Sequence, residues 1–281
     1  MKNLGYYNGK IDELENMSIP MLDRVSFFGD GVYDATYSRN YKILDLDEHL
    51  DRFFTSAKLL NINIKESKEE LKELLNLLVK KMDTDDNFVY WQVTRGTGIR
   101  THEYSSQNQA GNLWVNIFHK EILDVNKQVK VITMDDTRHL HCNIKTLNLI
   151  PAVMASQKAK ELGCFETIFH RNNRVTECAH SNVSIIKDNR FITPPTDNLI
   201  LAGITRKKLL EQCEKLGIEH EEKPFYINDL LTADEIIISS AGALCIQVVE
   251  IDGKKVGGKS PIILNKLKKA MLDDFYTKTD I

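Results

Sequence analysis

The sequence predicts an α+β protein built from two domains. A length of 281 residues is enough for about two domains of ordinary size. Most of the expected strands pair along the chain as hairpins with helices between them, which is typical of an α+β fold rather than a doubly wound parallel sheet. The charged segment 119–128 is the expected hinge, so we place the domains at residues 1–120 and 121–281.

The first domain is expected to begin with short strands separated by turn residues. Asn8–Gly9 is a hairpin signal. Residues 31–46 read as two strands that meet at Arg39 and Asn40. Later in the domain, strands 88–95 and 112–118 flank a loop from Gly96 to Gly111.

Two helices are expected between these strands. Residues 47–62 repeat apolar side chains at helical spacing, and Asp47 is placed to cap that helix. The second helix begins at Ser67, where Glu70 three residues later completes a capping box.

The second domain alternates strands with helices. Asn172–Asn173 and Asp252–Gly253 are expected turns. The expected strands are 129–134, 165–170, 174–177, 182–188, 190–195, 235–240 and 245–251, and the expected helices are 148–162, one after Gly203, one at 227–232 and one at the C-terminus.

Composition narrows the class of protein. The formal charge of −3, from 37 basic and 40 acidic residues, gives no reason to expect nucleic acid or an anionic membrane as a partner. No apolar run approaches the roughly 20 residues of a membrane span, and the first residues do not resemble a secretory signal. Five widely spaced cysteines favour a reducing compartment and argue against a zinc site. We therefore expect a cytoplasmic protein without a metal.

Lys145 stands between an expected strand and an expected helix. The simplest reading is a lysine whose amine reaches solvent. The functional alternative is a lysine that forms a Schiff base, which requires an amine that loses its proton readily. On the local sequence alone, the first reading is favoured.

Three further positions have a simple and a functional reading. Glu177 is either an ordinary carboxylate at a strand end or an anion that serves a ligand. Thr205 follows Gly203 at a helix N-terminus, and is either a plain cap or part of a phosphate site. Arg52 is expected on an exposed helix face unless a ligand is bound.

Together these residues suit one ligand, pyridoxal 5'-phosphate. They stand among several distinctive segments, which in chain order are FGDGVYD, DEHLDRF, QVTRGTGIRTH, IKTLNLIPAVMASQKAKELG, RNNRVTE, AGITR and VVEIDGK. In these segments and their order the chain resembles class IV (fold type IV) pyridoxal-phosphate aminotransferases, most closely those that act on D-amino acids. The similarity covers nearly the whole chain, and it implies a small N-terminal α/β domain and a larger C-terminal domain with a β-barrel-like sheet.

The resemblance implies a role for each candidate. Lys145 would hold the cofactor and move the Cα proton, and Glu177 would keep the pyridine nitrogen protonated so that the ring accepts electrons. Arg52 would bind the phosphate, together with the backbone of Ile204 and Thr205. A second phosphate contact would come from Ser240 and Ala241.

Substrate choice would depend on the first domain. Tyr33, Arg100 and His102 match the positions that trap the substrate carboxylate in D-amino acid enzymes. Arg100 and His102 are two residues apart in an extended loop, so both side chains can point the same way. The implied reaction is ping-pong transamination from a donor like D-alanine to an acceptor like 2-oxoglutarate, in a homodimer.

The chain departs from the family at two places. Cys178, Ala179 and His180 stand where glycine and serines are usual, and Ala241 replaces a common threonine. The alternatives are another class IV enzyme, such as a branched-chain aminotransferase or an aminodeoxychorismate lyase, and a protein that binds the cofactor without turnover. The carboxylate-trap residues argue against the first alternative, and the retained Lys145 and Glu177 argue against the second.

Overall fold

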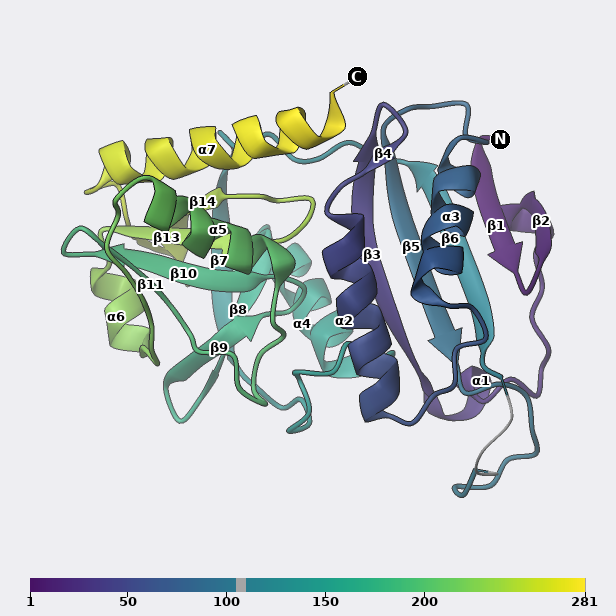
Figure 1. Ribbon diagram of the computed structural model, residues 1–281. Coiled ribbons are helices and arrows are strands. Elements are labelled where there is room, and N and C mark those ends of the chain that lie inside the picture. The colour runs from purple at the N-terminus through teal and green to yellow at the C-terminus, as the bar shows by residue number, and fades with distance from the viewer. Residues whose placement is uncertain (105–109, 281) are drawn as a thin grey trace. The chain divides into compact units, whose positions relative to one another are not determined.

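The computed structural model describes residues 1–104 and 110–280, so part of the expected loop from Gly96 to Gly111 lies outside the described residues (Figure 1). Contacts divide the chain into two compact units. Unit 1 comprises Met1–Glu121, Ile144–Asn148 and Thr277–Ile281, and unit 2 comprises Ile122–Asn143 and Leu149–Tyr276. The division into domains 1–120 and 121–281 stays a prediction.

Unit 1 is built on an antiparallel sheet with the strand order β2-β1-β6-β5-β3-β4. The hairpin signal at Asn8–Gly9 is confirmed, because both residues take positive φ between β1 and β2. The strands are β1 (Asn3–Tyr7), β2 (Lys10–Glu13), β3 (Gly31–Arg39), β4 (Lys42–Ile43), β5 (Asn87–Thr94) and β6 (Asn112–His119).

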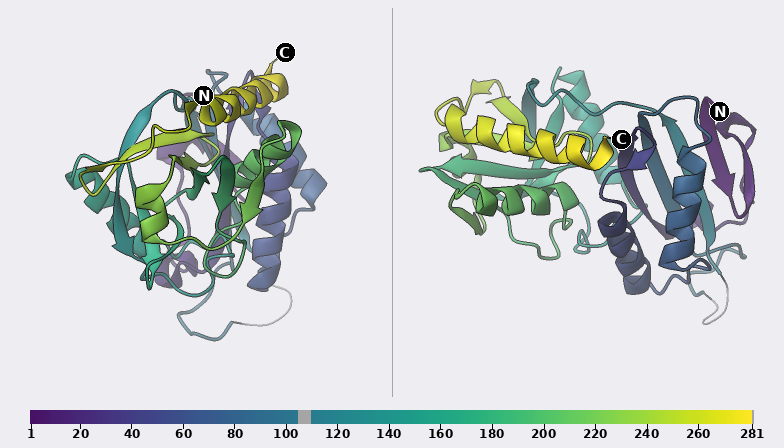
Figure 2. Two further views of the ribbon diagram at one scale, coloured as in Figure 1. Left: turned by 90° about the vertical axis from the view of Figure 1, so that its left-hand side faces the viewer. Right: turned by 45° about the horizontal axis from the view of Figure 1, so that its top comes forward.

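The two main helices of unit 1, α2 (Leu46–Leu59) and α3 (Lys68–Val79), pack their apolar sides into one core with the sheet (Figures 1 and 2). Ser67 and Glu70 form the predicted capping box. The prediction that Asp47 caps α2 is wrong: the N-cap is Asp45, in a left-handed conformation, and Asp47 lies in the first turn, where its charge favours the helix dipole. The unit also contains η1 (Leu14–Asn16) and α1 (Val25–Phe28), which the sequence did not predict.

Unit 2 is built on a mixed sheet with the strand order β12-β11-β10-β13-β14-β7-β8-β9, and β15 pairs with β14. The last strand on this path, β9, also approaches β10, so the sheet curls back on itself. The strands are β7 (Gln128–Asp135), β8 (Glu166–Arg171), β9 (Arg174–Cys178), β10 (Asn182–Lys187), β11 (Arg190–Thr193), β12 (His220–Glu222), β13 (Glu235–Ser239), β14 (Ile246–Ile251) and β15 (Lys254–Lys255).

The helices of unit 2 follow the predicted order. They are α4 (Ile150–Glu161), α5 (Ile204–Lys215), α6 (Ile227–Thr232) and α7 (Pro261–Thr279), whose last three residues belong to unit 1. Buried aliphatic side chains from the central strands and α6 form the main core of this unit. The α+β class predicted from the sequence is confirmed. Among the described residues, no helix is long and apolar enough to cross a bilayer.

Candidate active site

The backbone of Lys145 is fixed within unit 1 by two elements that lie far away in sequence. The amide of Tyr33 on β3 donates to the Lys145 carbonyl oxygen at 3.0 Å, and Thr146 forms a β-bridge with Val32. On the other side, the Lys145 amide donates to Ser56 Oγ of α2 at 3.2 Å. The lysine therefore continues the edge of a sheet, and α4 begins only at Ile150 rather than near Asn148.

The amine of Lys145 lies over an aromatic ring. Its Nζ is 4.3 Å from the centroid of Tyr33, close enough for a cation–π contact. Tyr33 stacks on Tyr90 at 5.5 Å, and the Tyr90 hydroxyl donates to Oε1 of Gln92 at 2.6 Å. The sequence did not single out Tyr90 and Gln92. Alternation along β5 places both side chains on one face of the sheet, and Gln92 pairs there with Tyr33 of the neighbouring strand β3.

Arg52 is not an exposed helix residue, and that expectation is wrong. Its side chain is only 14% exposed, because both Nε and Nη2 donate to the carboxylate of Asp34, at 2.8 and 2.7 Å. His49, one turn earlier on α2, places Nδ1 2.7 Å from the same carboxylate. The alternation of β3 could have indicated that Asp34 faces the core, but nothing in the sequence pairs it with Arg52.

Arg100 and His102 both lie against the same aromatic side chain, although the backbone bends at both positions and is not extended as expected. The Arg100 guanidinium carbon is 5.3 Å from the centroid of Phe28, and the His102 ring is 5.4 Å from it. The intervening Thr101 carbonyl accepts from Arg24 Nη1 at 2.8 Å, which anchors the loop to α1. Both side chains remain exposed.

In unit 2, Glu177 at the end of β9 is a buried carboxylate held by three donors. Arg138 Nη1 lies 2.5 Å from Oε1, while the amide of Leu201 and Nδ2 of Asn182 donate to Oε2 at 3.0 and 3.1 Å. These bonds favour the ionised form of Glu177. The simple reading of Glu177 as an ordinary strand-end carboxylate does not account for its burial or its three donors.

Arg138 is held in turn by Asp136. Its Nε and Nη2 both bond the Asp136 carboxylate at 2.9 Å. Burial alone would lower the pKa of Arg138, but the bonds to Asp136 and the charge of Glu177 outweigh this effect. The pKa is therefore raised above its usual value, and the guanidinium stays charged. Sequence reasoning missed both residues, since nothing in the local pattern marks them.

The N-terminus of α5 begins at Gly203, whose extended backbone provides the N-cap without a capping side chain. Thr205 lies inside the first turn and is buried, so the reading of Thr205 as the cap is wrong. A Cβ added to Gly203 would lie 1.8 Å from Oδ1 of Asn182. Because Asn182 also bonds Glu177 and the Leu201 carbonyl, it joins the carboxylate to the start of α5.

The two departures from the family pattern also lie in unit 2. His180 places Nδ1 2.7 Å from Oε2 of the fully buried Glu166, which also accepts from Ser181 Oγ at 2.9 Å. Cys178 is buried, and burial raises the pKa of its thiol well above the usual value, in keeping with a packing role. After β13, the Ser240 carbonyl accepts from the amide of Leu244 at 2.9 Å and so closes the turn that contains Ala241.

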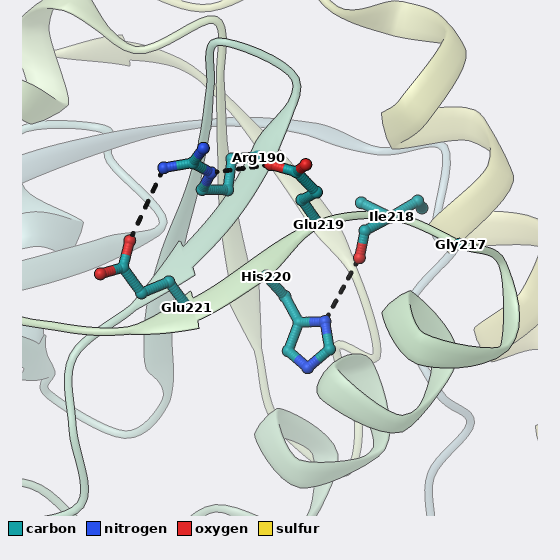
Figure 3. Close-up of a pocket in the computed structure, with 6 residues that line it drawn as sticks. All are labelled: Arg190, Gly217, Ile218, Glu219, His220 and Glu221. Carbon is teal, nitrogen blue, oxygen red and sulfur yellow. Dashed lines mark hydrogen bonds and ion pairs between the residues drawn. The ribbon is translucent and has the colours of Figure 1, made fainter.

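Unit 2 also carries a pocket on its surface. It is lined by residues of β11, β12 and the turn before β12 (Figure 3). Arg190 pairs there with Glu219 at 3.1 Å, and His220 Nδ1 lies 3.2 Å from the Ile218 carbonyl oxygen. None of the residues that line it is a predicted site residue.

Comparison with known proteins identifies the family. Residues 31–251 match the family model described as Amino-transferase class IV. The chain is 40% identical over 275 residues to a D-alanine aminotransferase of Bacillus licheniformis, covering 97% of each chain. It is 38% identical over 262 residues to a D-alanine aminotransferase of Listeria monocytogenes, covering 91% of this chain and 90% of that one.

Solved structures agree on the fold. The branched-chain amino acid aminotransferase of Escherichia coli superposes with a TM-score of 0.89 at 20% identity, covering 100% of this chain and 97% of that one. A fold IV-transaminase from Curtobacterium pusillum gives a TM-score of 0.82 at 20% identity, with 96% and 92% covered. The predicted fold type IV is thus confirmed, and the chain belongs to the class IV aminotransferase family.

Proposed function

We propose that this protein transfers amino groups from D-amino acids to 2-oxo acids with pyridoxal 5'-phosphate as cofactor. The donor resembles D-alanine and the acceptor resembles 2-oxoglutarate, and the two half-reactions alternate in a ping-pong cycle. The two relatives described above are D-alanine aminotransferases, and they align over nearly the whole chain. The observation that supports the chemistry most directly is the buried anion of Glu177 held by Arg138.

The residues present fit this cofactor. A protonated pyridine nitrogen requires an anion, and Glu177 is a buried carboxylate whose bonds favour the ionised form. A phosphate suits a helix N-terminus with no capping side chain, and Gly203 leaves α5 in that state. An aldehyde requires an amine, and Lys145 is half-buried with a fixed backbone. When bound, pyridoxal phosphate supplies an electron sink for the Cα carbanion.

Each residue has a distinct task in this proposal. Lys145 binds the cofactor covalently and moves the proton at Cα, and Glu177 holds the proton on the ring nitrogen. The phosphate is bound by Arg52, by the amides of Ile204 and Thr205, and by Ser240 with the amide of Ala241. The substrate carboxylate is bound by Tyr33, Arg100 and His102, which limits the face of Cα that the base can reach.

A panel of paired D- and L-amino acids, followed by the visible absorbance of the holoenzyme, tests the proposal. We expect D-alanine to bleach the cofactor band, whereas L-alanine and L-valine leave it unchanged. Bleaching by L-valine but not D-alanine would favour a branched-chain aminotransferase, and a band that no donor bleaches would indicate binding without turnover. Lys145→Ala is the matched control, because it should lose turnover with every donor.

The proposal includes a homodimer in the cytoplasm. Ile150, Val153 and Met154 project from one side of α4 and are 69%, 59% and 66% exposed. Large apolar side chains grouped in this way are typical of an interface, and a symmetric dimer would bury the same patch on both copies. All five cysteines are free thiols, which suits a reducing compartment.

A further inference from the structure

A fully buried carboxylate lies directly behind the guanidinium of Arg52. Asp34 on β3 accepts from Arg52 Nε through Oδ2 and from Nη2 through Oδ1, at 2.8 and 2.7 Å. Two parallel bonds of this kind fix both the position and the plane of a guanidinium. The carboxylate is itself oriented, because Oδ1 also accepts from the Ala35 amide at 2.8 Å. Asp34 therefore determines where the positive charge of Arg52 lies.

His49 supports the same carboxylate from α2. Its side chain is 3% exposed, and its Nδ1 lies 2.7 Å from Oδ1 of Asp34. Burial lowers the pKa of His49, so at neutral pH the imidazole is uncharged and Nδ1–H donates the bond. The edge of Trp91 packs against the ring at 6.3 Å between centroids. The cation of this cluster is therefore Arg52, paired with the single anion of Asp34.

We propose that Asp34 is a positioning residue for the cofactor phosphate, and that its effect on binding passes through Arg52. The inference rests on the proposed function, in which Arg52 binds that phosphate. A guanidinium has five N–H donors, and the two that face Asp34 set the direction of the others. A held guanidinium also loses less conformational entropy when an anion binds, because its long side chain is already ordered.

An ion pair that only stabilises unit 1 would behave differently. Its loss would cause misfolding and would weaken the binding of every ligand equally, whether or not the ligand carries a phosphate. Pyridoxal, which has the aldehyde and the ring of the cofactor but no phosphate, separates these two cases. The discrimination between pyridoxal 5'-phosphate and pyridoxal is therefore the quantity to measure.

The test is a spectral titration of the apoprotein with pyridoxal 5'-phosphate and with pyridoxal. We expect Asp34→Asn to raise the Kd of the phosphorylated compound at least tenfold and to leave that of pyridoxal within twofold. Asp47→Asn is the matched control: Asp47 lies on the same helix as Arg52, and the change removes only its exposed pair with Lys72 of α3, at 2.7 Å, so neither Kd should change. An equal rise of both Kd values for Asp34→Asn would overturn the proposal.

A double-mutant cycle tests whether Asp34 acts through Arg52. In an Arg52→Ala background, we expect Asp34→Asn to have no further effect on the Kd of pyridoxal 5'-phosphate. A full tenfold effect in that background would overturn the proposal. If Asp34→Asn does not fold, His49→Leu takes its place in the titration. This variant should lose affinity for pyridoxal 5'-phosphate but not for pyridoxal, by a smaller factor than Asp34→Asn, and His49→Asn, which keeps a donor at the Nδ1 position, should restore that affinity. Equal affinities of His49→Leu and wild type for pyridoxal 5'-phosphate would count against the proposal.

The same titration distinguishes this inference from the proposed function. A wild-type apoprotein that binds neither compound would contradict the proposed function and the inference with it. A wild-type protein that binds both, with an Asp34→Asn variant whose two Kd values change by the same factor, would contradict the inference alone.

Discussion

The buried imidazole of His49 makes the stability of the apoprotein depend on pH at the scale of one residue. Burial lowers its folded-state pKa below the unfolded value near 6.5. Below pH 6.5 the unfolded chain binds the proton more readily than the folded protein does. The contribution of His49 to the free energy of unfolding is therefore fully present above about pH 6.5 and is lost as the pH falls through the folded pKa.

We therefore expect His49→Asn to reduce the pH dependence of stability. Between pH 6.5 and 5, the wild-type protein should lose stability relative to the variant by at most about 1.4 kcal/mol per pH unit. Urea denaturation midpoints at several pH values measure the difference. Parallel curves for the two proteins would mean that His49 takes up its proton as easily in the folded state as in the unfolded state.

Single residues also show what sequence can and cannot predict about a site. Lys145 and Glu177 were proposed from a resemblance, because they stand in segments with a characteristic order. Their partners were not predicted: Arg138 reaches Glu177 across 39 positions, and Asp34 reaches Arg52 across 18. Such pairs depend on which strands and helices meet, and local periodicity carries no information on that.

At the scale of an element, the N-terminus of α5 depends on the absence of a side chain. Gly203 has an ordinary negative φ of −68°, so alanine meets no backbone strain there. The obstacle is space, since the added Cβ would overlap Oδ1 of Asn182 at 1.8 Å. Either Asn182 or the start of α5 must move, and Asn182 also bonds Glu177.

We expect Gly203→Ala to destabilise the protein by about 1–3 kcal/mol, the usual range for overpacking, and to weaken the retention of pyridoxal 5'-phosphate. Thermal unfolding and dialysis of the loaded protein measure the two effects. Gly98→Ala is the matched control, because a Cβ at Gly98 has nothing within 4 Å. Equal cofactor retention in both variants would show that the contact between Gly203 and Asn182 does not shape the site.

Elements with strong local signals were predicted well. The capping box of α3 and the Asn172–Asn173 turn contain their own hydrogen-bonding or positive-φ residues, so they need no tertiary information. Weak elements were missed for the opposite reason. Strand β12 has only three residues, is polar, and exists because it pairs in parallel with β11. The start of α2 was misplaced because Asp45 takes a left-handed backbone that no sequence rule required.

At the scale of the whole molecule, the exposed side of α4 predicts self-association. A negative charge in the middle of a symmetric apolar contact would be buried twice, once from each copy. We therefore expect Met154→Glu to convert a dimer into a monomer of 32.2 kDa. Sedimentation equilibrium measures the mass. Asn265→Glu adds the same charge at an exposed position of α7 and serves as the control. If both variants remain dimers, the interface does not include this side of α4.

The backbone pairing of Lys145 with β3 has a consequence for how the protein matures. The amide of Tyr33 and the hydroxyl of Ser56 emerge from the ribosome long before the lysine that they hold. Closing so long a loop is entropically costly, and such pairings tend to form late. Trapping of an aldehyde by this amine would then mark the end of refolding, and would serve as a chemical clock for it.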